Sequence, residues 1–299
     1  AKYTDLASVL TNWIGSDDPY KLMAQSEEDS INTFPTKRFS IPVDINVVKS
    51  NGTVGANDTA IVSAVNFEVQ RNIIMKNDLA VLAVIAANHW KRPIYFTNPN
   101  VEGLGFDQYL RRDGMTYRLV PVNNGQERVN TDWMLDKVMN KFTSGNANVP
   151  GVYFDEENRR HLNGIRQAFA DLALDLANRN RKEDGRKVLN KVDKLMLESN
   201  MPYGLVGRYN MQNRTSIMLL EAAYRNEDNV MIDKISRSVK KDLNQQMSYY
   251  ASLGDMSRQE LDGIMNKYIQ MAYTARSNQE RGAAEQYFQS SLQGRQMGM

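Results

Sequence analysis

The chain has 299 residues, a formal net charge of +2 and no cysteine. Its 41% hydrophobic and 24% charged residues are ordinary for a folded protein, which excludes a disordered tail and a collagen-like fibre. Without cysteine, disulfides, thiolate catalysis and thiolate zinc sites are excluded, and two histidines are too few to predict a histidine-rich metal site. We therefore predict no metal and no cofactor.

Charge and hydropathy argue against two classes of partner. Residues 1–150 hold 15 basic and 16 acidic side chains, and residues 151–299 hold 22 and 19, so neither half has the basic excess typical of nucleic-acid binding. The longest apolar stretch, residues 79–87, has nine residues, whereas a membrane span needs about 20. We expect no nucleic-acid partner and no membrane insertion by this chain. Because it begins with Ala1 rather than methionine, we expect a piece of a longer polypeptide.

The first half of the chain alternates strand and helix patterns. Val65, Phe67 and Val69 alternate with polar residues, which is the period of a half-buried strand. In chain order, we expect a strand at 39–43, a strand at 65–69, a helix capped at 77–78, a buried strand at 93–97, a short helix at 106–112, a strand at 115–122 and a helix opening at 130–132. This alternation predicts an α/β module with a small mixed sheet over residues 1–150.

The second half, residues 151–299, is predicted to be all-helical. We expect about six helices, at 156–178, 182–198, 208–225, 228–250, from a capping box at 257–260, and at 280–292. Short joins between helices force antiparallel hairpins. The pattern from Phe169 to Pro202 fits the roughly 34-residue period of tetratricopeptide repeats, although Gly185 near a helix start weakens the match. We predict a tetratricopeptide-like (TPR-like) array, with a plain helical bundle as the alternative, and an α+β fold overall.

The segment from Trp90 to Phe96 is the richest in chemically informative residues. Proline at 93 ends a helix and begins a strand, and ligands of α/β sheets bind near the carboxyl ends of strands. The candidate binding residues in this half are Trp90, Lys91, Arg92, Tyr95 and Arg118. The two arginines are suited to an anionic ligand or to acidic neighbours, and the sequence favours the second role. We assign no catalytic residue.

Tyrosine and methionine are abundant in the helical half. Tyr209 and Tyr249 are candidates for holding a peptide, because TPR-like surfaces use such side chains for that purpose. Packing in the core explains most of these side chains equally well.

Several motifs occur in an order that resembles a known family. They are Phe39–Asp44, Asn51–Val54, Lys76–Leu79, Trp90–Phe96, Tyr117–Pro121, Arg128–Asp132, Met139–Phe142 and Val152–Asp155. Together they resemble the C-terminal soluble region of a Bacteroidetes membrane-protein family known as DUF2723. That family is related to protein O-mannosyltransferases of the multi-spanning GT-C type. The resemblance covers roughly residues 35–255.

The resemblance implies a non-catalytic, extracytoplasmic region on the periplasmic side of the inner membrane. The family's catalytic residues belong to a membrane-embedded part, so none is transferred to this chain. The implied partners are an acceptor protein or peptide and the membrane-embedded part of the same polypeptide. Two alternatives stay open. One is a free-standing enzyme that binds a small molecule at the Trp90–Phe96 strand edge, and the other is a TPR-like adaptor unrelated to sugars.

Overall fold

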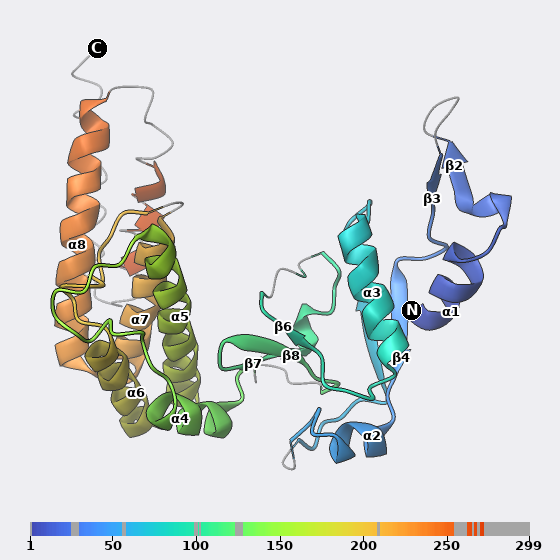
Figure 1. Cartoon of the computed structure of the whole chain (residues 1–299), viewed down its shortest axis with the longest axis horizontal. Helices are drawn as coiled ribbons and strands as arrows, with labels where there is room; N and C mark the ends of the chain where they lie inside the picture. Colours follow the sequence, from blue (N-terminus) through green and yellow to red (C-terminus); the bar gives the residue numbers. More distant parts are fainter. Residues whose placement is uncertain are drawn as a thin grey trace. The chain divides into compact units, whose positions relative to one another are not determined.

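The computed structural model describes residues 2–24, 30–55, 58–98, 101, 103–122, 128–207, 210–253, 262–264, 266–267 and 270–271. The chain divides into two compact units, Ala1–Asn130 and Thr131–Met299. The first unit holds small sheets with short helices, and the second is helical (Figure 1). The α+β class predicted from the sequence is confirmed.

The described part of the first unit contains three small sheets. Its elements are β1 (Thr4–Asp5), α1 (Leu6–Val9), η1 (Leu10–Ile14), η2 (Pro19–Lys21), β2 (Leu22–Ala24), β3 (Ser30–Asn32), β4 (Arg38–Pro42), α2 (Ile45–Ser50), β5 (Ala64–Glu68), α3 (Lys76–Asn88), β6 (Tyr95–Phe96), η3 (Asp107–Tyr109), β7 (Leu110–Asp113) and β8 (Thr116–Leu119). One sheet is mixed, in the order β1-β4-β5, with β1 parallel and β5 antiparallel to β4. The strands β6-β8-β7 form an antiparallel sheet, and β2 pairs with β3.

Alternating apolar residues on β4 and β5 build the core of the first unit. Phe39 stands opposite Phe67 and Ile41 opposite Val65, and all four are buried. The ring of Phe67 also meets that of Phe106 edge to face at 5.7 Å between centroids. Each of these strands lies within one residue of its predicted position, because burial of one face dictates the register of a strand.

The prediction of a helix at 106–112 is wrong. This segment forms the short turn η3 and then β7, which pairs with β8 through a two-residue loop between Asp113 and Thr116. Gly114, the first residue of that loop, has φ +65°, a conformation that favours glycine, and glycine at this position is a known hairpin signal. Arg111 and Arg112 are charged, so the sequence does not indicate a buried strand here, yet both side chains are buried.

The second unit consists of stacked helical hairpins. Its described helices are α4 (Thr131–Asn140), α5 (Glu156–Asn178), α6 (Lys182–Leu195), α7 (Met211–Arg225) and α8 (Asn229–Ser252). Within this unit, α5 packs against α6 and α7, and α7 packs against α8. The first residues of α5 and α7 are 55 positions apart, so the hairpins do not repeat at about 34 residues. The predicted capping box at 257–260 and the helix at 280–292 lie outside the described residues.

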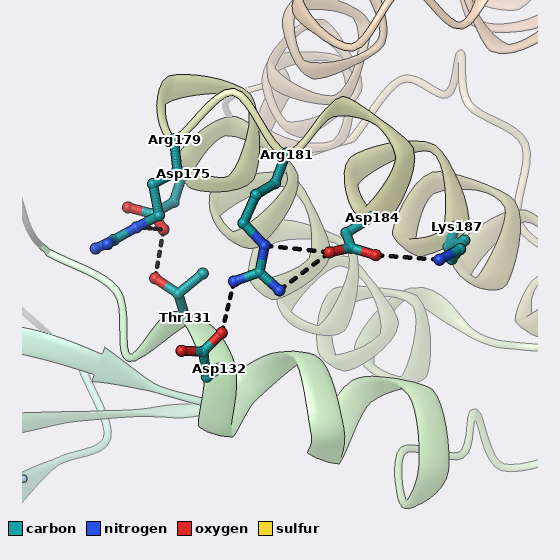
Figure 2. Close-up of polar contacts among 7 residues, drawn as sticks. All are labelled: Thr131, Asp132, Asp175, Arg179, Arg181, Asp184 and Lys187. Carbon is teal, nitrogen blue, oxygen red and sulfur yellow. Dashed lines mark hydrogen bonds and ion pairs between the residues drawn. The ribbon is translucent and has the colours of Figure 1, made fainter.

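A polar network ties the start of α4 to the turn between α5 and α6 (Figure 2). The hydroxyl of Thr131 donates to Asp175 at 2.5 Å, and this pair is buried. Arg181 pairs with Asp132 at 2.5 Å and with Asp184 at 3.0 Å. These bonds explain why α4 belongs to the second unit. The second unit therefore begins at Thr131, about 20 residues before the boundary expected from the sequence.

Gly185 lets α6 approach the end of α7. Asn226, which follows α7, is wholly buried and donates from Nδ2 to the carbonyl of Ala173 on α5 at 2.9 Å. A Cβ placed on Gly185 would overlap the Asn226 side chain, with 2.7 Å to Nδ2. The glycine that weakens the repeat pattern in the sequence is therefore a packing requirement of this hairpin array.

Candidate functional site

A cleft of ≈ 820 Å³ lies in the first unit at the carboxyl ends of the parallel strands β1 and β4. Its walls come from the β1–α1 junction, the β4–α2 junction and the end of α3, and the lining residues are Asp5, Leu6, Ala7, Ser40, Ile41, Pro42, Val43, Asp44, Ile45, Val47, Ala86, His89, Trp90 and Lys91. Crevices at the carboxyl ends of parallel strands are the usual ligand sites of sheets with such strands. We refer to this feature as the β1–β4 cleft.

Trp90 is a structural wall of the β1–β4 cleft. It is 5% exposed, its indole N–H donates to the Pro42 carbonyl at 2.8 Å, and its own carbonyl accepts from Asn51 at 2.5 Å. His89 and Trp90 end α3 with φ of 47° and 59°, a region that costs non-glycine residues about 1–3 kcal/mol each. The hydrogen bonds of Trp90 offset this strain, and they leave its ring buried rather than presented to a ligand.

Two carboxylates in the cleft are fixed as helix caps. Asp5 accepts the backbone N–H of Ser8 at 2.7 Å, and Asp44 accepts that of Asn46 at 2.9 Å. Such caps satisfy the free donors of a helix start. The lining also contains the exposed Lys91 and several apolar side chains, so capped carboxylates and one cation lie over an apolar floor, an arrangement that suits a polar or zwitterionic ligand. In the described part of the chain, no cluster of three His, Cys, Asp or Glu residues could hold a metal ion.

Arg118 lies outside the β1–β4 cleft and forms one of two neighbouring buried ion pairs. It pairs with Asp113 at 2.8 Å, and Arg111 stands opposite it across β7 and β8. Two opposed cations on neighbouring strands repel each other. Arg111 pairs with Asp58 at 2.8 and 3.0 Å, so the two carboxylates neutralise the two guanidinium groups. Arg118 thus takes the pairing role that the sequence favours.

The other predicted residues are dispersed. Lys91 lines the cleft, whereas Arg92 and Tyr95 are exposed residues outside its lining, and the Tyr95 ring lies 5.9 Å from the Arg118 guanidinium. In the second unit, Tyr249 is exposed on α8 and packs on the ring of its neighbour at 5.1 Å. Tyr209 lies outside the described residues.

A second hollow, of ≈ 460 Å³, lies in the helical unit and is absent from the sequence predictions. Behind it, the wholly buried Arg166 donates to the Pro202 carbonyl at 2.8 Å and stacks 4.4 Å from the Tyr203 ring centroid. The Tyr203 hydroxyl donates to Asp193 at 2.8 Å. Burial lowers the pKa of Arg166 and raises the pKa of Tyr203. This network fixes the segment that joins α6 to α7.

The position of Arg166 could have been predicted from the sequence. It lies four residues after Leu162 and three before Phe169, both of which are apolar, so it falls on the buried stripe of α5. The partners that stabilise it are backbone carbonyls about 36 positions away, which the sequence pattern does not reveal.

The part of the chain from β1 to α4 matches a family model. Residues 1–140 match the model of the family TMEM260-associated domain 2. That family is tied to membrane proteins that resemble protein O-mannosyltransferases. The match ends with α4 and covers less than half of the 299 residues. No curated protein and no solved structure matches the chain significantly. Among the described helices, none has the length and apolar character needed to cross a membrane.

Proposed function

We propose that this chain is a non-catalytic part of a multi-spanning membrane protein that resembles protein O-mannosyltransferases, and that its helical unit binds the acceptor protein. The observation that carries the proposal is the match of residues 1–140 to a family tied to such proteins. The ordered motifs from Phe39 to Asp155 support a narrower assignment to the DUF2723 family of Bacteroidetes and to the periplasmic side of the inner membrane.

The helical unit supports a binding role. Arrays of stacked hairpins present extended surfaces that hold segments of other proteins. In this unit, the packing of α5 against α6 and α7, and of α7 against α8, forms such an array. In the first unit, Asp58 and Asp113 are engaged by buried arginines, which is a structural use of both carboxylates. These observations favour binding over chemistry in this part of the protein.

A second candidate function is small-molecule binding in the first unit. The β1–β4 cleft favours it, because its position at the carboxyl ends of parallel strands is a common ligand site. If the cleft holds a ligand, Lys91→Ala should weaken binding, whereas Arg92→Ala, outside the lining, should leave it unchanged. Equal binding by both variants and the unmodified chain would contradict a site in this cleft.

Deletion of residues 131–299 from the full-length protein tests the binding role. We expect transfer of sugar to the acceptor protein to fall, while the remaining protein stays monodisperse in detergent and keeps its thermal stability. Intact-mass measurement of the acceptor reports transfer. Unchanged transfer would contradict the proposal. The 299-residue chain supplied with donor and acceptor tests the non-catalytic part, and sugar transfer by this chain alone would overturn it.

A further inference from the structure

The hollow in the helical unit is a groove between one face of α8 and the segment that follows α6. The α8 side consists of Lys234, Arg237, Ser238, Lys241, Asp242 and Gln245, whose spacing of three and four residues places them on one helical face. The opposite wall contains Glu198, Pro202, Gly204 and Leu205. We refer to this feature as the α8 groove.

The two walls of the α8 groove are locked together at one point. The backbone N–H of Gly204 donates to the Ser238 hydroxyl at 3.0 Å. A Cβ on Gly204 would overlap the backbone carbonyl of Ser238, so a larger residue would force the walls apart. The buried Arg166 holds the same wall from behind through the Pro202 carbonyl. The groove is therefore a fixed part of the fold.

Two cations of the α8 groove have no partner among the described residues. Lys234 is paired with Asp193 at 2.6 Å, and Asp242 accepts amide hydrogen bonds. Arg237 and Lys241, by contrast, are exposed and have no ion pair or hydrogen bond within the described ranges. Like charges at i and i+4 on a helix repel each other, so an anion bound between these two side chains is favoured.

The spacing of the free cations matches an extended peptide. Four residues along a helix rise about 6 Å. In an extended strand, alternate residues lie on the same side and are about 6.6–6.8 Å apart. Two carboxylates at alternate positions of an extended segment would therefore meet Arg237 and Lys241 together. The intervening residue would face the other wall, where Glu198 disfavours a second row of negative charge.

We propose that the α8 groove binds an extended acidic segment of the acceptor protein, with acidic residues at alternate positions and non-acidic residues between them. This inference rests on the proposed binding role of the helical unit and specifies the chemistry of the bound segment. Glu198 and Asp242 in the lining make the groove a poor site for nucleic acid, whose charge is not confined to one side.

Fluorescence anisotropy of labelled 12-residue peptides, titrated with the 299-residue chain, tests the proposal. We expect the alternating Glu-Ala peptide to bind, the Gln-Ala peptide not to bind, and binding to weaken as salt is raised. The double variant Arg237→Glu/Lys241→Glu should bind the Glu-Ala peptide about tenfold or more weakly and should gain affinity for a Lys-Ala peptide. The matched variant Lys191→Glu/Lys194→Glu places the same charge change on α6, outside the groove, and should bind normally.

Several outcomes would overturn the proposal. These are equal binding of the Gln-Ala peptide, no loss with the groove variant, an equal loss with the α6 variant, or binding of a DNA duplex that depends on the same two cations. Circular dichroism checks that the variants fold, which we expect because Arg237, Lys241 and Lys194 are exposed and Lys191 is only half-buried. If the peptide does not bind but deletion of residues 131–299 reduces transfer, the α8 groove is not the binding site and the binding role of the helical unit stands. If the peptide binds but the deletion leaves transfer unchanged, the groove binds acidic segments and the proposed function is wrong.

Discussion

Replacement of Gly185 by alanine is expected to destabilise the helical unit, although alanine is the better helix former. The added methyl group would overlap the buried side chain of Asn226. Asn226 would have to leave its position, and its hydrogen bond to the Ala173 carbonyl would be lost. The effect therefore opposes the one expected from helix propensity alone.

The size of this effect follows from three contributions. Alanine in place of glycine within a helix favours folding by about 1 kcal/mol. Overpacking a filled site costs about 1–3 kcal/mol. Loss of the buried hydrogen bond from Asn226, with its amide donor left unsatisfied, costs about 1–3 kcal/mol. The sum is a destabilisation of about 1–5 kcal/mol, centred near 3 kcal/mol.

Native-state hydrogen exchange measures the free energy of opening of α5 and α7 separately from the first unit. Gly263→Ala is a matched control, because the described residues place no obstacle within 4 Å of the added Cβ, and it should leave α5 and α7 unchanged. In an Asn226→Ala background the obstacle is absent, so Gly185→Ala should be neutral or stabilising there. Equal destabilisation in both backgrounds would show that the contact with Asn226 is not the cause.

Three further predictions concern named polar contacts. Trp90→Phe removes the indole bond to the end of β4 and should destabilise the first unit by about 1–3 kcal/mol, measured by exchange in α3; unchanged exchange would contradict this role. Asp58→Asn leaves Arg111 without its carboxylate and should cost about 3–5 kcal/mol in urea unfolding, whereas a neutral result would show that the pair is dispensable. A hydrogen bond from Lys187 lowers the pKa of Asp184 below the ordinary value of 3.8. The ionised Asp184 therefore stabilises the folded state above about pH 4, and this stabilisation is lost as the pH falls through the lowered pKa of the folded state. Thermal unfolding should therefore show a wild-type advantage over Asp184→Asn above about pH 4 that shrinks as the pH is lowered further, and an advantage that does not change with pH would contradict it.

The helices and strands that are predicted best are those whose apolar residues form one continuous buried face. The helix expected at 156–178 is observed at Glu156–Asn178, because Asp155 caps its start through the Asn158 N–H and apolar residues recur on one side. The strands β4 and β5 are predicted for the same reason, since alternation alone fixes which face is buried. Local pattern and tertiary packing agree in these elements.

The sequence fails where a polar residue is buried by a distant partner. Arg111 lies in a strand because Asp58, 53 positions earlier, neutralises it. Trp90 was singled out for its chemistry, and the carbonyl that fixes it lies 48 positions earlier. Lys91 lines the β1–β4 cleft, and its backbone N–H donates to the Asn88 carbonyl at 2.9 Å in the turn that ends α3. The α8 groove was missed because its cations look like an ordinary solvated helix face until the opposite wall is known.

The proposed function requires that residues 131–299 bind the acceptor protein and leave the chemistry to the rest of the full-length protein. The steady-state kinetics of sugar transfer by the full-length protein, with and without these residues, test this division of roles. Loss of a unit that only binds acceptor should raise the KM for the acceptor protein and leave kcat intact. A fall in kcat with unchanged KM, or no change in either constant, would contradict the claim.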